Sequence, residues 1–486
     1  MSLDLRLQRW PERGGATRHR SLWVRQALAA EPDGDSEVLA GARQADLCIV
    51  GGGFTGLWTA IRVLEQAPTT QIVIVEADRC GSGASGRNSG GMGHWWPKLP
   101  TLRRLLGGDD ALRVLRHSID VLDDIRGFIA REGIACELRS SPSVWSETAP
   151  GKAGAWHAMF QTARELGVTP PHRVLTADEL RGYFGQGPYH AGIIEDSATR
   201  VQPALLARGL SRVAVRLGAQ VYEQSPVTRI RGDAQGLVVQ TSGGEVRAPR
   251  LVLAANAWMA DLPEFRARIN VVGSDIVITD PIPELLDRLG MRQRPGGVNS
   301  RLMLNYGGLT ADGRVYVGRG GGEIAFGNIV GTRFDASPRF AREVEADLRY
   351  LYPELRNVPI ADAWSGPIDR SATGLPWFGT LEADARVHYA IGYSGHGVAA
   401  SALGGRILAA QVLERDDEWL SLGKCFLRAR TGHFPGEPLR SAAGHLIRGA
   451  VSRKESAERA GRKPGALDTR LASYALASLP DRQRPS

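Results

Sequence analysis

The sequence predicts an α/β fold, α+β overall, in which a Rossmann-type nucleotide-binding domain is combined with a second, sheet-based domain. Three observations predict it: a buried strand followed by a glycine turn and a helix near residue 50, a second strand that ends in an acid, and a strand-rich block from Ile269 to Ile360. A chain of 486 residues is too long for one ordinary hydrophobic core. We therefore expect two or three domains.

The first observation concerns Leu47 to Val50, four consecutive apolar residues that are typical of a parallel strand buried on both faces. The strand leads into Gly51-x-Gly53-x-x-Gly56 and then into a helix. The first glycine permits a tight turn, the second lets backbone approach a pyrophosphate, and the third lets helix and strand pack closely. The free N–H groups at the helix N-terminus favour an anion. This motif predicts a dinucleotide site.

The second observation is the strand Ile72 to Val75, which ends in Glu76. Glu76 follows Gly56 by 20 residues, the separation expected for a carboxylate that binds a ribose hydroxyl. A glutamate rather than an arginine at this position indicates an unphosphorylated 2′-hydroxyl. The cofactor is therefore FAD or NAD.

Composition excludes several classes of protein. With 43% hydrophobic and 23% charged residues the chain is typical of a globular protein, and no apolar run reaches the 18 or so residues that a membrane span needs. The first 20 residues are polar and rich in arginine, without the apolar region of a signal peptide. We expect a cytoplasmic protein that does not bind a membrane.

Charge and cysteine usage narrow the function further. The net charge of +8 comes almost entirely from arginine, and no nucleic-acid-binding motif is present. The four cysteines, at positions 48, 80, 136 and 425, form no CxxC pair. We therefore expect no nucleic-acid partner, no metal site and no disulfide framework.

We expect a discontinuous organisation, in which segments far apart in sequence share a domain. The expected parts are an N-terminal arm over 1–44, packed through Trp23; a nucleotide-binding domain from 45–98, 195–268 and 365–440; a substrate domain from 99–194 and 269–364; and a basic, partly helical and otherwise mobile tail over 441–486. Within this organisation, Gln220 to Tyr222 and Val227 to Ile230 alternate with Leu237 to Thr241, as in a hairpin layer.

Two further segments point to a flat ligand. Cys80 to Gly93 is rich in small residues, which let backbone lie against a ligand with many N–H groups exposed. A second glycine turn, Gly392 to Gly397, follows a strand and opens the apolar helix from Val398 to Leu413. The dipole of that helix can stabilise negative charge, such as that on the N1–C2=O edge of a reduced flavin.

With these segments placed, the chain resembles the D-amino acid oxidase-like FAD amine oxidases, over about residues 21 to 440. The segments that carry the resemblance are Val50 to Gly56, Gly83 to Gly91, Gly374 to Gly379 and Gly392 to Gly397. The likeness is nearest to the gamma-glutamylputrescine oxidase branch. It implies an FAD domain beside a substrate domain whose sheet covers the flavin. It also implies hydride transfer to flavin from the carbon next to an amine nitrogen, which gives an imine, with O2 as the expected electron acceptor.

Two departures from the family pattern matter. Relatives that bind flavin covalently use a cysteine in the segment that here spans Trp364 to Asp369, which has none, so we expect non-covalent FAD. Sarcosine oxidase-like members use a lysine over the flavin to activate oxygen, yet no lysine occurs between Lys152 and Lys424. We therefore expect another cation, Arg319 or protonated His396, or else an acceptor other than oxygen.

The candidate catalytic residues are His396, Arg319 and Tyr306, and Arg301 is a further candidate for binding a substrate carboxylate. The candidate cofactor-binding residues are Gly51, Gly53, Phe54, Thr55, Gly56, Glu76, Ala77, Ser85, Arg87, Asn88, Ser89, Gly90, Val227, Ala255, Gly374, Gly395, His396, Gly397 and Val398.

Some of these assignments have structural alternatives. His94, Trp95 and Trp96 either form a wall of the substrate cavity or belong to the core. Asp369 and Arg370 read as a structural pair rather than a catalytic one.

Alternative functions remain open from the sequence. They are an FAD dehydrogenase or subunit that passes electrons to another acceptor or a partner, a flavin-folded binding protein, a flavin monooxygenase, and an NAD-linked dehydrogenase. The expected substrate is a small amine or amino acid. Neither its identity nor the oligomeric state follows from the residues.

Overall fold

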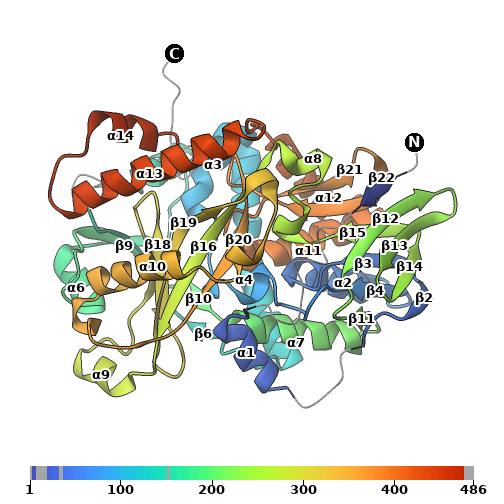
Figure 1. The fold of residues 1–486 in the computed structure, drawn as a ribbon, viewed down its shortest axis with the longest axis horizontal. Coiled ribbons are helices and arrows are strands. Elements are labelled where there is room, and N and C mark those ends of the chain that lie inside the picture. Colours follow the sequence, from blue (N-terminus) through green and yellow to red (C-terminus); the bar gives the residue numbers. More distant parts are fainter. Residues whose placement is uncertain (1–2, 7–18, 32–36, 150–153, 476–486) are drawn as a thin grey trace.

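Two large β-sheets organise the chain in the computed structural model, which describes residues 3–6, 19–31, 37–149 and 154–475. In Figure 1 the eight-stranded sheet lies to the left and the six-stranded, nucleotide-binding type of sheet to the right. The mixture of parallel sheet, antiparallel sheet and helices confirms the predicted α/β, overall α+β, fold class.

The six-stranded sheet is parallel except for one edge strand. Its order is β11 (Gln220–Tyr222), β4 (Ile72–Val75), β3 (Leu47–Val50), β15 (Arg250–Leu253), β22 (Asp384–Ile391) and β21 (Trp377–Leu381). The expected hairpin layer is confirmed for the strands at 227–233 and 236–241, which pair antiparallel. It is wrong for Gln220 to Tyr222, which pairs in parallel with β4 instead.

The opening strand is apolar on every residue because both faces of its sheet are covered. Leu47 and Ile49 point into the core that contains the helices α2 (Phe54–Gln66), α7 (Pro203–Arg216) and α11 (Gly397–Val412). Cys48 and Val50 alternate with them and pack beneath the five-stranded sheet. This second layer is β1 (Asp4–Arg6), β12 (Val227–Asp233), β13 (Gly236–Thr241), β14 (Gly244–Ala248) and β2 (Gly41–Gln44).

The eight-stranded sheet is formed largely by chain from the predicted substrate domain. Its order is β20 (Ile360–Ser371), β16 (Ile269–Thr279), β19 (Val315–Ile324), β18 (Asn305–Leu309), β17 (Gly296–Asn299), β7 (Ser143–Glu147), β9 (Ala191–Glu195) and β8 (His172–Leu175). One face packs under α6 (Ala177–Phe184), α9 (Pro283–Arg288) and α10 (Pro338–Leu351). Residues on the other face line a cavity.

The remaining elements connect and cover these sheets. They are α1 (Leu22–Ala29), α3 (Leu99–Leu106), α4 (Gly108–Glu132), α5 (His157–Glu165), α8 (Pro263–Arg266), α12 (Glu418–Arg428) and a small sheet of β5 (Gly91–Met92), β10 (Thr199–Arg200) and β6 (Arg139–Ser140). Short 3₁₀ turns are η2 (Ala84–Gly86), η3 (Trp96–Lys98), η4 (Asn256–Met259), η5 (Phe326–Asn328), η6 (Thr332–Phe334) and η7 (Pro353–Leu355).

The described part of the N-terminal arm is packed through Trp23, as predicted. The Trp23 ring meets Tyr316 and Trp364 edge-on at 5.7 and 5.4 Å, and its Nε1 donates to the carbonyl of Asn88 at 3.0 Å. Residues 7–18 of the arm lie outside the described residues.

The basic C-terminal segment is helical in part, as predicted, but its helices pack on the molecule where the sequence predicts an otherwise mobile tail. It forms α13 (Leu439–Arg459) and α14 (Ala466–Ala472), which lie over the eight-stranded sheet (Figure 1). Glu455 pairs with Arg301 of the loop between β17 and β18, and Arg448 and Arg459 pair with acids of α10 (Pro338–Leu351). Composition alone predicts a mobile tail because it does not reveal these partners. Residues 476–486 lie outside the described residues.

Candidate active site

A cavity of about 910 Å³ is lined by residues of both large sheets, by the small-residue segment 82–94 and by the C-terminal helices. Its volume falls within the range of about 300–1,000 Å³ that is usual for ligand pockets. The cavity brings together the two glycine turns that the sequence singles out.

The first glycine turn forms one part of this cavity. Gly51 has φ +112°, and a Cβ at this position would lie 2.7 Å from the carbonyl oxygen of Ala254 on the neighbouring strand. Only glycine fits this close approach. The α2 N-terminus, with Gly53, Phe54 and Thr55, faces the cavity and presents its N–H dipole there. These features fit the pyrophosphate of a dinucleotide.

Glu76 lies beside this turn in the cavity wall. Its carboxylate accepts hydrogen bonds from the backbone N–H groups of Gly52 at 2.7 Å and Asp78 at 3.0 Å. Burial raises the pKa of Glu76 to about 7, against the lowering effect of these two bonds. The backbone bonds orient the carboxylate at the edge where a ribose would lie. Ala77, Val227 and Ala255 line the same part.

Three predicted cofactor-binding glycines do not line the cavity. A Cβ on Gly56 would overlap the carbonyl oxygen of Gly51, so this residue sets the packing of α2 on β3, as the motif requires. A Cβ on Gly90 would likewise overlap the carbonyl oxygen of Val201. Gly374 lies against the Lys98 amine, whose Nζ would be 3.0 Å from a Cβ there. Their contribution is to shape the backbone that surrounds the site.

Arg87 and Asn88 line the cavity, but their polar ends are bonded to the protein. The Arg87 guanidinium is buried and donates to the carbonyl oxygens of Ser82 at 2.9 Å and Ser365 at 3.0 Å. The Asn88 amide donates to the carbonyls of Ala84 and Ser85. These bonds fix the shape of segment 82–91, and the expected contacts of both side chains with the cofactor stay a prediction.

Ser85 and Ser89 in this segment also line the cavity. The Ser85 hydroxyl accepts a hydrogen bond from the N–H of Phe54 at 2.9 Å, which ties the segment to the start of α2.

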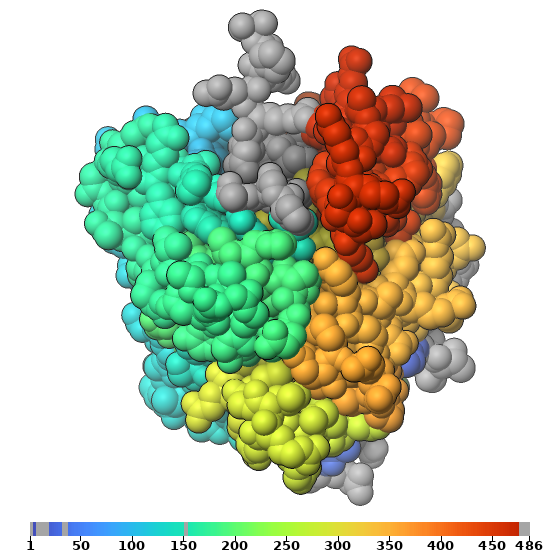
Figure 2. All heavy atoms as spheres, turned by 90° about the vertical axis from the view of Figure 1, so that its left-hand side faces the viewer, coloured from blue at the N-terminus to red at the C-terminus, as the bar shows by residue number. Residues whose placement is uncertain are grey.

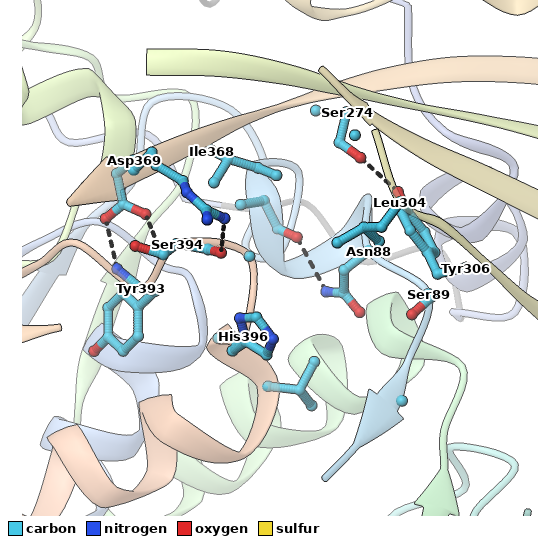
Figure 3. A pocket seen from close by; sticks show the side chains of 18 of the residues that line it. Asn88, Ser89, Ser274, Leu304, Tyr306, Ile368, Asp369, Tyr393, Ser394 and His396 are labelled. Atoms are coloured by element: carbon cyan, nitrogen blue, oxygen red, sulfur yellow. Dashed lines mark hydrogen bonds between the residues drawn. The ribbon is translucent and has the colours of Figure 1, made fainter. Parts of the chain in front are cut away.

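Tyr306 stands on β18 in the wall formed by the eight-stranded sheet (Figure 3). Its hydroxyl lies 2.7 Å from the Ser274 hydroxyl on β16. The opposing residue on β19 is Gly318, where a Cβ would overlap the Tyr306 ring. Burial raises the pKa of Tyr306 above its ordinary value, so the phenol is protonated and can donate a hydrogen bond.

The second glycine turn is held by Asp369. Its carboxylate accepts from the backbone N–H groups of Gly392 at 2.5 Å, Tyr393 at 3.2 Å and Ser394 at 3.4 Å (Figure 3). Asp369 therefore has a structural role through backbone amides, and its predicted pairing with Arg370 stays a prediction. The turn places Gly395, His396, Gly397 and Val398 in the cavity wall at the α11 N-terminus.

The surroundings of His396 favour its neutral imidazole. Desolvation, followed by the positive charges of Lys98 and Arg370, lowers its pKa to about 3, although the residue is exposed to the cavity. The lowered pKa argues against protonated His396 as the cation for oxygen, and that role stays a prediction. The family pattern does not point to Lys98, which is far in sequence from the second glycine turn but lines the cavity from the start of α3.

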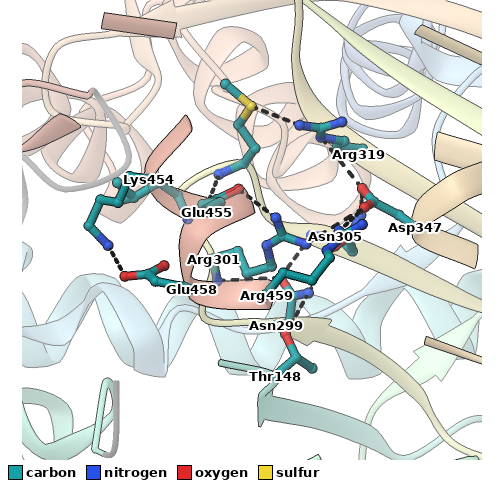
Figure 4. A network of polar contacts seen from close by, with 12 residues as sticks. Thr148, Asn299, Arg301, Asn305, Arg319, Asp347, Lys454, Glu455, Glu458 and Arg459 are labelled. Carbon is teal, nitrogen blue, oxygen red and sulfur yellow. Dashed lines mark hydrogen bonds and ion pairs between the residues drawn. The ribbon is translucent and has the colours of Figure 1, made fainter. Parts of the chain in front are cut away.

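Arg319 does not line the cavity, contrary to expectation. Its guanidinium lies 2.9 Å from the Glu343 carboxylate and 3.5 Å from the Asp347 carboxylate, both on α10 (Figure 4). These two acids, distant in sequence, draw the side chain away from the site. Arg301 lines the cavity but is paired with Glu455 at 2.9 Å.

The aromatic pair Trp95 and Trp96 belongs to the core and not to the cavity wall. The Trp95 ring packs edge-on against Phe426 of α12 at 5.5 Å. His94 does line the cavity, where its Nε2 lies 3.4 Å from the Glu195 carboxylate. Burial opposes ionisation of Glu195, but hydrogen bonds from His94 and Ser197 outweigh it and lower its pKa.

All four cysteines are buried with free thiols, and none of them lines the cavity. In the described residues no helix is both long and apolar enough to cross a membrane.

The chain that forms this site can be assigned to a known protein family. A family model described as FAD dependent oxidoreductase, DAO, matches residues 46–411, and the chain belongs to this family. The resemblance drawn from the sequence is thereby confirmed, and FAD is the cofactor. The Gly51 cradle, the α2 N-terminus and Glu76 are residues that fit its adenosine diphosphate end.

The chain is also similar, at lower sequence identity, to individual proteins of known name. The chain is 29% identical over 412 residues to gamma-glutamylputrescine oxidoreductase of Escherichia coli, covering 83% of this chain and 91% of the relative. It is 26% identical to the probable oxidoreductase OrdL of Haemophilus influenzae, covering 78% and 85% of the two chains. Glycine oxidase of Geobacillus kaustophilus is 24% identical, over 80% of this chain and 97% of the relative.

Solved structures agree on the fold. The crystal structure of Geobacillus kaustophilus glycine oxidase superposes with a TM-score of 0.63 at 21% identity, covering 77% of this chain and 96% of that one. L-proline dehydrogenase from P. horikoshii gives a TM-score of 0.60 at 18% identity, covering 78% and 95%.

Proposed function

We propose that this FAD-dependent oxidoreductase oxidises the C–H bond next to the nitrogen of a small amine or amino acid, with O2 as electron acceptor. The observation that carries the proposal is the single cavity in which an α2 dinucleotide cradle continues into a wall formed by Tyr306, Ser274 and His396. The relatives named for gamma-glutamylputrescine and glycine support an amine substrate.

The balance of the reaction requires little acid–base chemistry. FAD, when bound, supplies the hydride acceptor. The substrate loses a hydride from carbon and a proton from nitrogen, and the imine that results is hydrolysed by water to a carbonyl compound and ammonia or an amine. The two electrons pass on to O2, which with two protons becomes hydrogen peroxide. The protein has to orient the substrate and keep its nitrogen unprotonated.

The described residues are suited to those tasks. The hydroxyls of Tyr306 and Ser274 can hydrogen-bond a polar substrate group on the side of the eight-stranded sheet. A neutral imidazole at His396 has one ring nitrogen that can accept a hydrogen bond from the substrate nitrogen. The α11 N-terminus, held by Asp369, presents N–H groups where negative charge can be stabilised.

The test is anaerobic reduction of the purified yellow holoenzyme across a panel of amino acids, N-methyl amino acids, polyamines and aminophosphonates. We expect bleaching of the visible flavin band by at least one amine, and one hydrogen peroxide per turnover in air. Bleaching by NADPH with no amine active would contradict the proposal and favour a monooxygenase.

A second candidate is an FAD dehydrogenase that passes its electrons to another acceptor. It gains support because Arg319 lies outside the cavity wall and the surroundings of His396 favour its neutral form. Turnover with a redox dye but none with O2 would establish this alternative.

A further inference from the structure

Part of the cavity wall comes from chain beyond the matched family segment. The family match ends at residue 411, whereas α13 and α14 span 439–472. Figure 1 shows these helices on the side of the eight-stranded sheet, away from β4 and the nucleotide end. In Figure 2, which views that side, they form the red surface next to the orange segment that includes α10. The residues within 439–475 that line the cavity are Gly444, Ile447, Arg448, Val451, Tyr474 and Ala475. We call Ile447, Val451, Tyr474 and Ala475 the C-terminal wall.

A buried carboxylate fixes the C-terminal wall to the cavity loop between β17 and β18. Glu455 of α13 is 2% exposed and accepts from the backbone N–H groups of Leu302 at 2.8 Å and Met303 at 3.2 Å. It also pairs with Arg301 at 2.9 Å (Figure 4). Because Arg301, Leu302 and Met303 all line the cavity, α13 determines the shape of this loop.

The charged residues of α13 are satisfied by the sheet and by α10. Arg448 donates to the carbonyl of Gly321 at 2.6 Å and lies 3.2 Å from Glu343. Arg459 pairs with Asp347 (Figure 4). These contacts hold the helix at both ends of its cavity face.

Between the contacts of Arg448 and Arg459, the side chains that this segment presents to the cavity are mainly apolar. Val451 and Ala472 form a cluster with Met303, and Leu302, Ile447 and Ala475 pack around it. Leu304 and Ile324 extend the apolar lining on the sheet side. Burying an apolar group here releases water without leaving a polar atom unpaired.

We propose that the C-terminal wall recognises an apolar group of the substrate, remote from the carbon that is oxidised. The inference rests on the proposed amine oxidation and names its substrate class: amines or amino acids that carry an aliphatic or aromatic side chain. Within a homologous series, kcat/KM should rise about fourfold for each methylene that the wall buries.

The test uses Ile447→Gln in the full-length holoenzyme, with the adjacent Leu446→Gln as matched control. Leu446 is 55% exposed, whereas Ile447 faces the cavity. The series runs from glycine through alanine and norvaline to norleucine, with the corresponding alkylamines. For Ile447→Gln we expect the ratio of kcat/KM between the longest and shortest substrate to fall about tenfold. Leu446→Gln should keep the parent ratio.

A second pair guards against misfolding of the first variant. Tyr474→Ala removes wall area from a residue that is 53% exposed, and Leu467→Ala, at 69% exposure on α14, is its control. FAD content and circular dichroism establish that each variant is folded. If the parent oxidises amines but its chain-length profile is flat, or is the same in Ile447→Gln and Tyr474→Ala, the inference fails alone. If no amine reduces the parent's flavin, the proposed function fails and the inference falls with it.

Discussion

Desolvation by the surrounding protein acts on the imidazole rings of three histidines: His172, His388 and His396. Desolvation lowers the pKa of the first two to about 4 and that of His396 to about 3. Burial has the opposite effect on carboxyl groups, raising the pKa of Glu76 to about 7 and that of Asp369 to about 6. The two kinds of residue therefore make opposing contributions to stability in mildly acidic solution.

His388 gives the clearest pH prediction, because it lies on β22 and does not line the cavity. The unfolded chain binds a proton on this residue below about pH 6.5, but the folded protein binds it only below about pH 4. Stability is therefore complete above about pH 6.5 and is lost as the pH falls toward 4. We expect about 2 kcal/mol less stability at about pH 5 than at pH 7.5 from this residue.

The measurement is urea unfolding of the parent and of His388→Asn across that pH range. Other titrating groups are common to both proteins, so the difference between the two curves isolates His388. Parallel curves would show that the folded imidazole titrates normally.

Lys98 allows a prediction about the electron acceptor. The positive charge of Lys98 contributes to the lowered pKa of His396, so Lys98 lies near the second glycine turn. Reduction of O2 develops negative charge, which a nearby cation stabilises. We expect Lys98→Met to slow reoxidation of the reduced enzyme by O2 on the order of tenfold to a hundredfold. Its anaerobic reduction by amine should change little.

Stopped-flow mixing of the reduced enzyme with oxygenated buffer measures this rate. Lys424→Met is the control, since Lys424 is exposed on α12 and lies outside the cavity wall. Equal reoxidation rates in the two variants would remove Lys98 from any role toward oxygen.

At the scale of elements, the position of α2 on the sheet depends on the close contact of Gly56 with the carbonyl group of Gly51 in the preceding turn. A Cβ on Gly56 would overlap the Gly51 carbonyl oxygen and lie 3.1 Å from Ile49 on β3. Gly56→Ala should therefore push α2 off the sheet, lower the free energy of unfolding by about 1–3 kcal/mol or more, and release FAD. Gly127→Ala, in the exposed middle of α4 with nothing near its Cβ, should instead stabilise by up to about 1 kcal/mol.

Thermal unfolding and the FAD-to-protein ratio of the purified variants measure both effects. Gly56→Ala with full FAD content would contradict the packing role assigned to this glycine.

The same elements show why part of the site could be predicted from the sequence. The strand, turn and helix around Gly51 and the strand ending at Glu76 are neighbours in the chain, so periodicity and spacing are enough to place them. The position of Trp95 depends on Phe426, and that of Arg319 on two acids of α10. Such partners are chosen by tertiary packing, which local pattern does not record. Lys98 was missed for the same reason.

At the scale of the whole molecule, the C-terminal helices connect the chain's last described segment to the cavity. The sequence predicts helix there but not its location, because the anchors are single residues with distant partners. Glu455 reaches Leu302 and Met303, and Arg440 donates to the carbonyl of Arg266 at 2.7 Å. A segment that composition describes as a tail is therefore part of the structure around the substrate.

The last prediction tests that connection. Glu455→Ala leaves the N–H groups of Leu302 and Met303 without their acceptor and removes one partner of buried Arg301. Loss of one member of a buried ion pair costs about 3–5 kcal/mol, although Asp347, 3.6 Å from Arg301, will offset part of it. We expect a lower free energy of unfolding and a raised KM for amines, with FAD content unchanged because the loop lies away from the nucleotide end.

The control is Glu458→Ala on the same helix, which breaks only the ion pair with Lys454. It should lower the free energy of unfolding by about 0.2–0.5 kcal/mol. Equal losses in the two variants, measured by urea unfolding and steady-state kinetics, would show that α13 does not fix the cavity loop.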